Sequence, residues 1–389
     1  MNPRVLAYSF DGMGLGHLRR NLNLVGALRK RLPTAAVLSV TGSGALDRFA
    51  LPEGVDVLRL PGLVKTTLGT TKSARLPIPV GDVRAVRSAL IKAACLSYRP
   101  DLVLVDFYPL GRDGELREGL EVLREANPDA RLVLGLRDIL DSPDTVRREW
   151  HDSGHFAAAA ELYDAVLVYG DPNVYDARIE YKFPSTLADK TIFTGYLGPE
   201  RNQAPATCEP GVHPEIICTM GGGSDAASMA EVFVEAVASF LPEHTAMLLT
   251  GPFMSALEVQ RLESIAPAGL RVTSFLADAQ DWFSQASCVV SMAGYNTTCE
   301  LLAAGVPTVF VPRSRPRLEQ RMRATLISEI TGWPVILPEH LDARALREGI
   351  AATLRMPRGE SVPIWLDGCA TAARVMAGLV DAVPSEVAL

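Results

Sequence analysis

The first feature of the chain that could do chemistry is a histidine in a glycine-rich turn. The turn reads DGMGLGH and ends at His17, directly after an apolar strand predicted over Arg4–Phe10. Histidine has the pKa of a general base near neutral pH. A lone histidine at a helix start more often caps or packs, but the carboxyl end of a strand is where an open α/β sheet holds its ligand. His17 is therefore a candidate catalytic residue.

The same turn argues against a nicotinamide-dependent enzyme. The third glycine of the dinucleotide fingerprint would have to stand at position 17, which is histidine. The second predicted strand ends in Ser39-Val40-Thr41-Gly42, without the acidic residue that would bind a ribose. These two mismatches exclude a dehydrogenase.

A second candidate site lies in the C-terminal half. The apolar run Cys288–Met292 predicts a buried strand. Thr297–Glu300 has the spacing of a capping box, which predicts a helix that starts near Asn296 and ends at Gly305. With a further strand over Thr308–Val311, these elements make a βαβ unit whose strand ends and helix start suit a ligand.

Two interpretations of this helix start are open. In the first, Glu300 completes the capping box, and Asn296 and Thr297 only satisfy backbone N–H groups. In the second, the helix dipole and free amides bind an anion, and Glu300 accepts hydrogen bonds from hydroxyl groups of the ligand.

A second glycine-rich turn, Gly221-Gly222-Gly223, precedes a helix predicted over Ala226–Phe240. Glycines at this place let backbone amides approach a diphosphate without obstruction by side chains. The turn is not a P-loop, because no Gly-Lys-Ser/Thr follows it.

Taken together, these motifs resemble the signature of the family 28 (MurG-like) nucleotide-sugar glycosyltransferases. The matching residues are Gly14, Gly16, His17, Gly294, Glu300, the Ala303–Pro307 turn, Glu319, Gln320 and Ala324. The resemblance implies an α/β chain with the GT-B fold, in which two Rossmann-like doubly wound parallel-sheet domains face each other across a cleft. The donor would bind to the C-terminal domain and the acceptor to the N-terminal domain.

The resemblance also implies roles for individual residues. Glu300 would hold the ribose hydroxyls, and Asn296 and Thr297 would meet the diphosphate. Glu319 and Gln320 would touch the donor sugar, although Glu319 stands where the family has glutamine.

Two further turns match the family by position. Gly221–Gly223 corresponds to the second glycine loop, with Gly223 in the place of the serine of the family. The segment Phe275-Leu276-Ala277-Asp278 resembles the turn that holds the base through backbone groups.

The function implied is transfer of a sugar from a nucleotide-diphosphate donor, a UDP-sugar, to an acceptor hydroxyl with inversion. His17 would be the base. Asp106, at the end of the predicted strand Leu102–Val105, either orients His17 as in related enzymes or only caps the next loop. The alternatives are a nucleotide-sugar hydrolase or epimerase on the same fold, and a binding protein without catalysis.

No metal and no cofactor is expected. Helix starts and backbone amides can neutralise the leaving diphosphate, and the sequence has no Asp-x-Asp motif to hold a metal ion. The partners expected are the nucleotide-sugar and an acceptor that is a small molecule, a glycan or a lipid-linked compound.

Four parts are expected along the chain. They are an acceptor domain at 1–198, a proline-rich linker at 199–214, a nucleotide-sugar domain at 215–365, and a C-terminal helix at 366–389 that crosses back to the first domain. Threonine, glycine and lysine in Leu63–Arg75 predict a loop, which we assign to acceptor recognition.

Composition narrows the class of protein. The chain has 389 residues, 48% of them hydrophobic and 21% charged, so it can bury the cores of two domains. A formal net charge of -7 argues against a general nucleic-acid binder. The six cysteines have no CxxC spacing, and neither a signal peptide nor a membrane span is evident. A cytoplasmic protein with at most peripheral membrane contact is expected.

Overall fold

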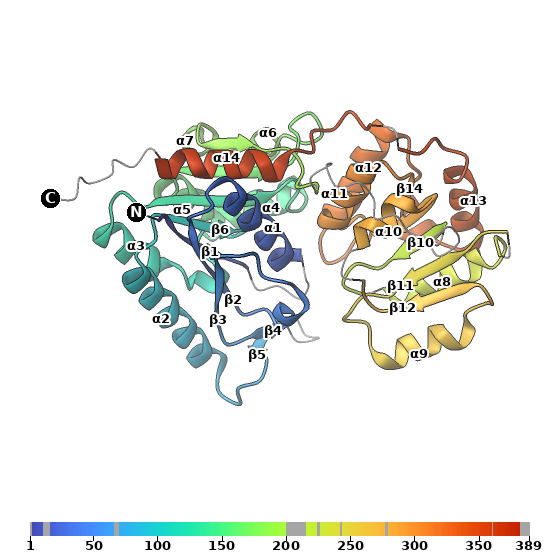
Figure 1. Ribbon diagram of the computed structural model, residues 1–389, viewed down its shortest axis with the longest axis horizontal. Helices are drawn as coiled ribbons and strands as arrows, with labels where there is room; N and C mark the ends of the chain where they lie inside the picture. The colour runs from blue at the N-terminus through green and yellow to red at the C-terminus, as the bar shows by residue number, and fades with distance from the viewer. Residues whose placement is uncertain are drawn as a thin grey trace. The chain divides into compact units, whose positions relative to one another are not determined.

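The computed structural model describes residues 2–10, 16–65, 70–199, 215–223, 226–241, 243–276, 279–359 and 361–381. The chain forms two compact units (Figure 1). The first unit comprises residues 1–138, 143–197 and 367–389, and the second comprises residues 139–142 and 198–366. Apart from residue 199, the predicted linker lies outside the described residues.

The first unit alternates strands with helices. Its strands are β1 (Arg4–Tyr8), β2 (Ala36–Thr41), β3 (Val55–Arg59), β4 (Leu63–Lys65), β5 (Thr71–Ser73), β6 (Leu102–Asp106), β7 (Arg131–Arg137), β8 (Ala165–Tyr169) and β9 (Thr191–Phe193). Its helices are α1 (Gly16–Arg31), α2 (Val80–Tyr98), α3 (Arg117–Ala126), α4 (Pro143–Asp152), α5 (His155–Leu162), α6 (Ala177–Glu180), α7 (Ser185–Ala188) and α14 (Gly368–Asp381), with short 3-10 helices η1 (Leu46–Arg48) and η2 (Arg112–Gly114).

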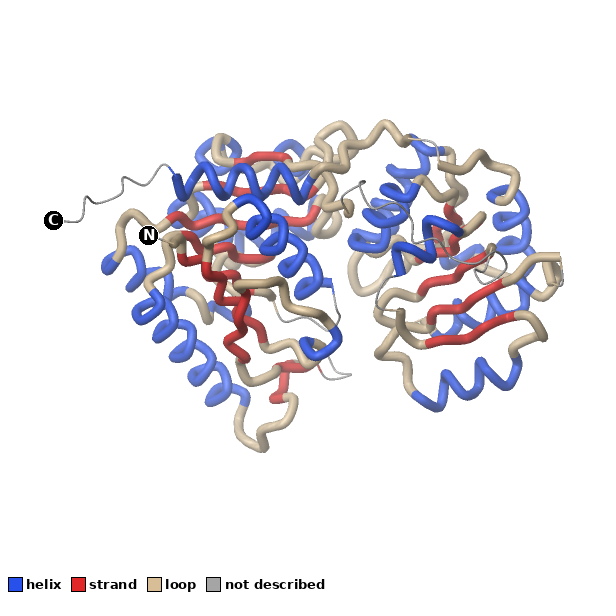
Figure 2. The backbone as a smooth tube through the Cα atoms, viewed as in Figure 1, coloured by secondary structure: helices blue, strands red, loops and turns tan. Residues whose placement is uncertain are grey.

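The main sheet of the first unit is parallel, with the strand order β3-β2-β1-β6-β7-β8-β9 (Figure 2). The chain moves from β1 to β2 in one direction, and from β6 to β7 in the other. Because parallel crossovers are right-handed, this reversal places α1 and α3 on opposite faces of the sheet. The switch point therefore lies between β1 and β6, where Tyr8 is in register with Val105.

Helix α14 follows the second unit in the chain but packs on α1 in the first unit. Its start is tied by a bridge between Leu197 and Asp367 and by the bond from the Gly368 N–H to the Tyr196 carbonyl, 3.0 Å. A side chain at position 368 would meet the Gly195 carbonyl oxygen at 2.5 Å. Glycine is therefore required at this close approach of two backbones.

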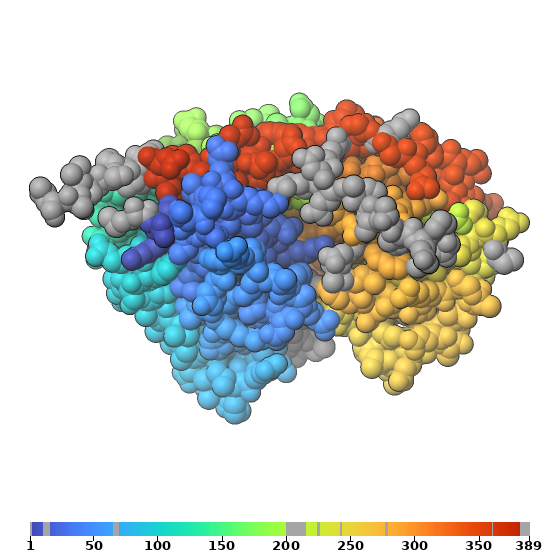
Figure 3. Space-filling model, in the orientation of Figure 1, coloured from blue at the N-terminus to red at the C-terminus, as the bar shows by residue number. Residues whose placement is uncertain are grey.

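The prediction of a loop over Leu63–Arg75 was wrong in part. Residues of β4 and β5 pair as a short antiparallel hairpin, with Val64 opposite Lys72, while residues 66–69 lie outside the described part of the chain. The charged and threonine-rich composition concealed strands of only three residues, too short for a periodic pattern. Residues 74–79, between this hairpin and α2, are exposed at the surface (Figure 3).

The second unit repeats the architecture on a smaller sheet. Its strands are β10 (Ile216–Thr219), β11 (Ala246–Leu249), β12 (Leu270–Thr273), β13 (Cys288–Ser291) and β14 (Thr308–Phe310). Its helices are α8 (Ala227–Val237), α9 (Ala256–Ile265), α10 (Ala279–Gln285), α11 (Tyr295–Ala304), α12 (Glu319–Thr331), α13 (Ala343–Thr353) and the 3-10 helix η3 (Pro338–His340).

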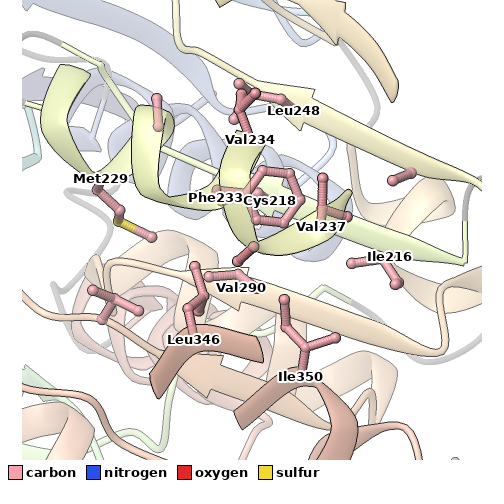
Figure 4. Close-up of a cluster of buried hydrophobic side chains, with 14 of the residues drawn as sticks. Ile216, Cys218, Met229, Phe233, Val234, Val237, Leu248, Val290, Leu346 and Ile350 are labelled. Carbon is pink, nitrogen blue, oxygen red and sulfur yellow. The ribbon is translucent and has the colours of Figure 1, made fainter. Parts of the chain in front are cut away.

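The core of the second unit lies between its sheet and two helices that contact each other, α8 and α13 (Figure 4). Phe233 of α8, Leu346 and Ile350 of α13, and Val290 of β13 are fully buried in it. All strand pairs are parallel, in the order β12-β11-β10-β13-β14. The switch point of this sheet lies between β10 and β13, and the turns that follow these two strands therefore meet at one edge.

Candidate active site and donor site

The first unit brings His17 and Asp106 together at its switch point. Asp106 is the last residue of β6, and His17 is the second residue of α1, which follows the neighbouring strand β1. The Nδ1 atom of His17 lies 2.5 Å from Oδ2 of Asp106. Gly16 is the first residue of α1, and Gly14 lies outside the described residues.

An arginine that the sequence motifs did not reveal completes this cluster. Arg20, one turn after His17 on α1, donates from Nε and Nη2 to Oδ1 of Asp106 at 3.0 and 2.6 Å. Both Arg20 and Asp106 are buried, whereas the His17 side chain keeps 19% of its surface exposed. Asp106 is thus fixed through one oxygen and holds His17 through the other, while the imidazole stays within reach of solvent.

The electrostatics set the protonation of the pair. Burial raises the pKa of Asp106, but the opposing charges of Arg20 and His17 prevail and hold it at about 2, below its ordinary 3.8. Burial lowers the pKa of His17 below 6.5; Asp106 opposes this shift, and Arg20 and Arg137 reinforce it. At neutral pH the carboxylate is therefore ionised and the imidazole neutral.

The tautomer of His17 follows from this geometry. An ionised carboxylate 2.5 Å from Nδ1 requires a proton between them, so Nδ1 donates to Asp106. The other ring nitrogen, Nε2, makes no hydrogen bond to any residue that the structure describes. A neutral imidazole with an available Nε2 and an anchored Nδ1–H can accept a proton as a general base.

Aromatic rings surround the imidazole. The ring centroids of Phe10 and Phe107 lie 5.4 and 5.5 Å from that of His17. Tyr108 packs against both phenylalanines, at 5.3 and 4.2 Å. These rings reduce the solvation of His17, which is consistent with the downward shift of its pKa.

In the second unit, the glycine turn after β10 has a backbone conformation that requires glycine. Gly221 and Gly223 have φ of 58° and 87°. A Cβ atom at Gly223 would meet the Thr250 carbonyl oxygen at 2.1 Å, and one at Gly222 would touch Phe253. A serine at position 223 could not adopt this conformation. This explains why the chain has glycine where the family has serine.

The capping box predicted at the start of α11 was wrong. The helix begins at Tyr295, its N-cap is Gly294, and no side chain caps it. Glu300 therefore lies in the second turn, beyond the N3 position, where it is buried with 7% of its surface exposed. Asn296 and Thr297 are half-buried in the first turn, at the helix end whose dipole favours a negative charge.

The two residues predicted to contact the donor sugar lie at the start of α12, in the second unit. Glu319 and Gln320 are its first two residues and are buried. Oε1 of Gln320 accepts a hydrogen bond from the Arg313 N–H at 3.3 Å, and Glu319 lies 3.8 Å from the Arg313 guanidinium. Arg323, one turn later and fully buried, donates to the Ala293 carbonyl at 2.9 Å and so joins α12 to the turn before α11.

Phe275 and Leu276, the residues predicted to lie near the base, follow β12 and are half-buried. Ala277 and Asp278 lie outside the described residues. Among the residues that the structure places, no cluster of three or more His, Cys, Asp or Glu side chains could hold a metal ion. No described helix is long and apolar enough to cross a bilayer.

Comparison with known proteins connects this geometry to a family. Residues 216–359 match the family model described as the glycosyltransferase family 28 C-terminal domain. The match covers most of the second unit. The part matched contains the glycine turn after β10, helix α11 and the start of α12.

Two relatives carry the name UDP-N-acetylglucosamine--N-acetylmuramyl-(pentapeptide) pyrophosphoryl-undecaprenol N-acetylglucosamine transferase. That of Haemophilus ducreyi is 25% identical over 231 residues, 55% of this chain and 61% of the relative. That of Caulobacter vibrioides is 26% identical over 155 residues, 38% of this chain and 43% of the relative. The chain thus matches less than two thirds of the length of these relatives.

Solved structures show the fold of the whole chain. Acinetobacter baumannii MurG covers 98% of this chain with a TM-score of 0.57 and 15% identity, with 99% of its own length covered. The glycotransferase of kitacinnamycin covers 99% with a TM-score of 0.64 and 16% identity, with 100% of its own length covered. The predicted fold class, two Rossmann-like parallel-sheet units of the GT-B type, is confirmed. The resemblance to the MurG-like family 28 proteins is confirmed as well.

Proposed function

We propose that this protein is a glycosyltransferase that moves a sugar from a UDP-sugar to an acceptor hydroxyl, with inversion and without a metal ion. The observation that carries the proposal is the bond of 2.5 Å between Nδ1 of His17 and a carboxylate that Arg20 holds in place. The family 28 domain and the names of the relatives support the sugar-transfer reaction.

In this mechanism Nε2 of His17 takes the proton of the acceptor hydroxyl as its oxygen attacks the anomeric carbon. The bond between that carbon and the diphosphate oxygen breaks, and UDP leaves with the bonding electron pair. Asp106 remains ionised and stabilises the imidazolium that forms. Attack from the face opposite to the leaving group inverts the configuration.

The second unit would bind the donor. Amides of Gly221–Gly223 and of the first turn of α11, with Asn296 and Thr297, would neutralise the diphosphate. Glu300 would accept hydrogen bonds from the ribose hydroxyls, now that its capping role is excluded. Glu319 and Gln320 would contact the donor sugar, and Phe275 and Leu276 the base.

We also propose a cytoplasmic location with at most peripheral membrane contact. The five cysteines that the structure describes are free thiols, which is typical of a reducing compartment. Neither nucleic acid nor a cofactor is part of the proposed reaction.

The function is tested with isotopically labelled UDP-sugars and a panel of hydroxyl-bearing acceptors, with products identified by mass spectrometry. Transfer of label to an acceptor is expected, and NMR of the product should show an inverted anomeric centre. Release of free sugar at a rate that no acceptor changes would instead show a hydrolase. A retained anomeric configuration would contradict direct displacement.

A further inference from the structure

A buried arginine near His17 has no carboxylate partner among the residues that the structure describes. Arg112 follows β6 in the short helix η2, and only 7% of its surface is exposed. Its guanidinium lies over the ring of Phe10, with the central carbon 5.0 Å from the ring centroid. Within the described part of the chain, its Nε atom has no hydrogen-bond partner, and no ion pair is recorded between Arg112 and another residue.

The two carboxylates close to Arg112 in the sequence are bonded to other residues. Asp113 pairs with Arg84 at 2.6 Å. Glu115 receives two bonds of 2.6 Å from Arg87 and a third of 2.6 Å from the Tyr8 hydroxyl. Neither carboxylate of this turn is therefore available to Arg112.

The turn holds Arg112 in one position. Gly111 has φ of 68°, and a Cβ atom there would meet the Leu116 side chain at 2.7 Å. The backbone N–H of Arg112 donates to the Tyr8 hydroxyl at 3.1 Å, and the same hydroxyl is bonded to Glu115. The guanidinium is therefore preorganised, as a binding group has to be.

A buried cation without a counter-charge is costly, and a cation–π contact offsets only a part of that cost. A planar guanidinium with unused donors is suited to bind the oxygens of a carboxylate or a phosphate. The ring of Phe10, which lies under the guanidinium, also contacts His17 with 5.4 Å between centroids. An anion bound to Arg112 would thus lie near the proposed base.

A second arginine adds positive charge near His17. Arg137 lies over the ring of Phe107, 5.5 Å from its centroid, and its charge lowers the pKa of His17. Asp106 is already bonded to Arg20 and His17. The positive charge of Arg112 is therefore not balanced by the carboxylate nearest to the base.

We propose that Arg112, on the Phe10 ring, binds an oxyanion group of the acceptor, a phosphate or a carboxylate. The inference rests on the proposed function and names the chemical class of its unknown substrate. An acceptor is favoured over the donor because the residues that match the nucleotide-sugar family lie in the second unit. The anion would hold the acceptor hydroxyl close to Nε2 of His17.

The probe is inorganic phosphate, titrated by calorimetry into protein saturated with UDP, which fills the diphosphate site proposed in the second unit. Acetate is titrated in parallel to distinguish a carboxylate site from a phosphate site. Arg112→Gln should weaken binding of the preferred anion roughly 10- to 100-fold, the loss expected for charge-assisted hydrogen bonds. The matched control is Arg117→Gln, which removes an exposed arginine five residues away. It should leave anion binding unchanged.

A thermal melt separates binding from a structural role. Removal of an unpaired buried charge should leave the Tm of Arg112→Gln unchanged or higher, whereas a structural arginine would lower it. If Arg112→Gln does not fold, Arg112→Lys serves instead, because it keeps the charge and loses the planar fork. It should bind the anion several-fold more weakly at an unchanged Tm.

Three results would overturn the inference. The first is that the wild type binds neither phosphate nor acetate. The second is that the wild type and the Arg112 variants bind the anion with equal affinity. The third is that Arg112→Gln loses as much UDP affinity as anion affinity, which would assign the residue to the donor. Failure of the proposed function is distinct, because it would show as absent UDP binding in the wild type itself.

Discussion

Arg20 and Arg137 favour the neutral form of His17, while Asp106 favours the charged form. Burial acts in the same direction as the arginines and prevails. The imidazole is therefore ready to accept a proton at neutral pH, and the carboxylate is ready to stabilise it once it has done so. This division of roles depends on two arginines, of which Arg20 was indicated by no sequence motif.

His17→Ala should lower kcat about 10²- to 10⁴-fold, the usual contribution of a general base. Because the pKa of His17 is shifted below 6.5, wild-type kcat should be level near pH 7 and fall as the pH decreases below 6.5. The variant should lose this acidic limb. Steady-state rates over a pH series measure both effects.

The control for this prediction is UDP affinity, which should barely change because the residues proposed to bind the donor lie in the second unit. Near-normal turnover in His17→Ala would show that the histidine has only a structural role. Asp106 would then be the next candidate for the base. Loss of UDP binding would mean that the turn after β1 contacts the diphosphate.

Asp106 also gives a prediction about stability. Its pKa in the folded state, about 2, lies below the ordinary 3.8, so its contribution is fully present above pH 3.8 and is lost as the pH falls toward 2. Between pH 5 and pH 3 the free energy of unfolding should fall by on the order of 1 kcal/mol more in the wild type than in Asp106→Asn. Urea denaturation at the two pH values measures this difference. Equal losses would show that the ion pair does not stabilise the fold.

At the scale of elements, both switch points could be predicted from strands that end in glycine turns, because parallel strands bring their carboxyl ends to one edge. The pairing of His17 with Asp106 follows from that rule although 89 residues separate them. Helix α2 was missed because Arg87, buried by its bonds to Glu115, stands in the apolar row Val83, Ile91 and Cys95.

The start of α11 was misplaced for a different reason. Gly294 caps the helix without a side chain, so the sequence holds no polar residue that marks the true N-cap. The Thr297–Glu300 spacing lies inside the helix and matches a capping box by coincidence. A four-residue spacing of this kind can occur anywhere in a helix, so by itself it does not mark the first turn.

Because Glu300 does not cap α11, its role in ligand binding can be tested separately from helix capping. Glu300→Ala should weaken UDP binding by about one to two decades, because charge-assisted hydrogen bonds contribute roughly 1.5–3 kcal/mol. The matched control is the real capping box of α9, where Ser255 and Glu258 bond reciprocally. Ser255→Ala should cost about 0.5–2 kcal/mol of stability and leave UDP affinity unchanged. Titration calorimetry and thermal melts check both variants, and unchanged UDP affinity in Glu300→Ala would remove its assignment to ribose.

The helix starts predict the response to a chelator. If amides of Gly221–Gly223 and α11 neutralise the leaving diphosphate, transfer should continue in EDTA at a rate close to that of the untreated protein. The measurement is the initial rate of UDP release. Loss of activity in EDTA with recovery on addition of magnesium or manganese would contradict this account.

At the scale of the whole molecule, the first unit is assembled from segments far apart in sequence, and α14 is the last of them. Gly368→Ala should destabilise the protein by about 1–3 kcal/mol, because its methyl group would meet the Gly195 and Tyr196 carbonyl oxygens at 2.5 and 2.6 Å. The matched control is Gly378→Ala on the same helix, where no atom lies within 4 Å and alanine favours the helix. Denaturant titration measures both, and equal effects would show that the start of α14 tolerates a side chain.

The position of α14 also bears on the order in which the protein is made. The ribosome synthesises residues 367–381 after all of the second unit, yet they complete the first. Domains usually fold from the N-terminus as they emerge. Here the apolar face of α1 that α14 covers stays open to chaperones until translation has passed the second unit, so the unit begun first is finished last.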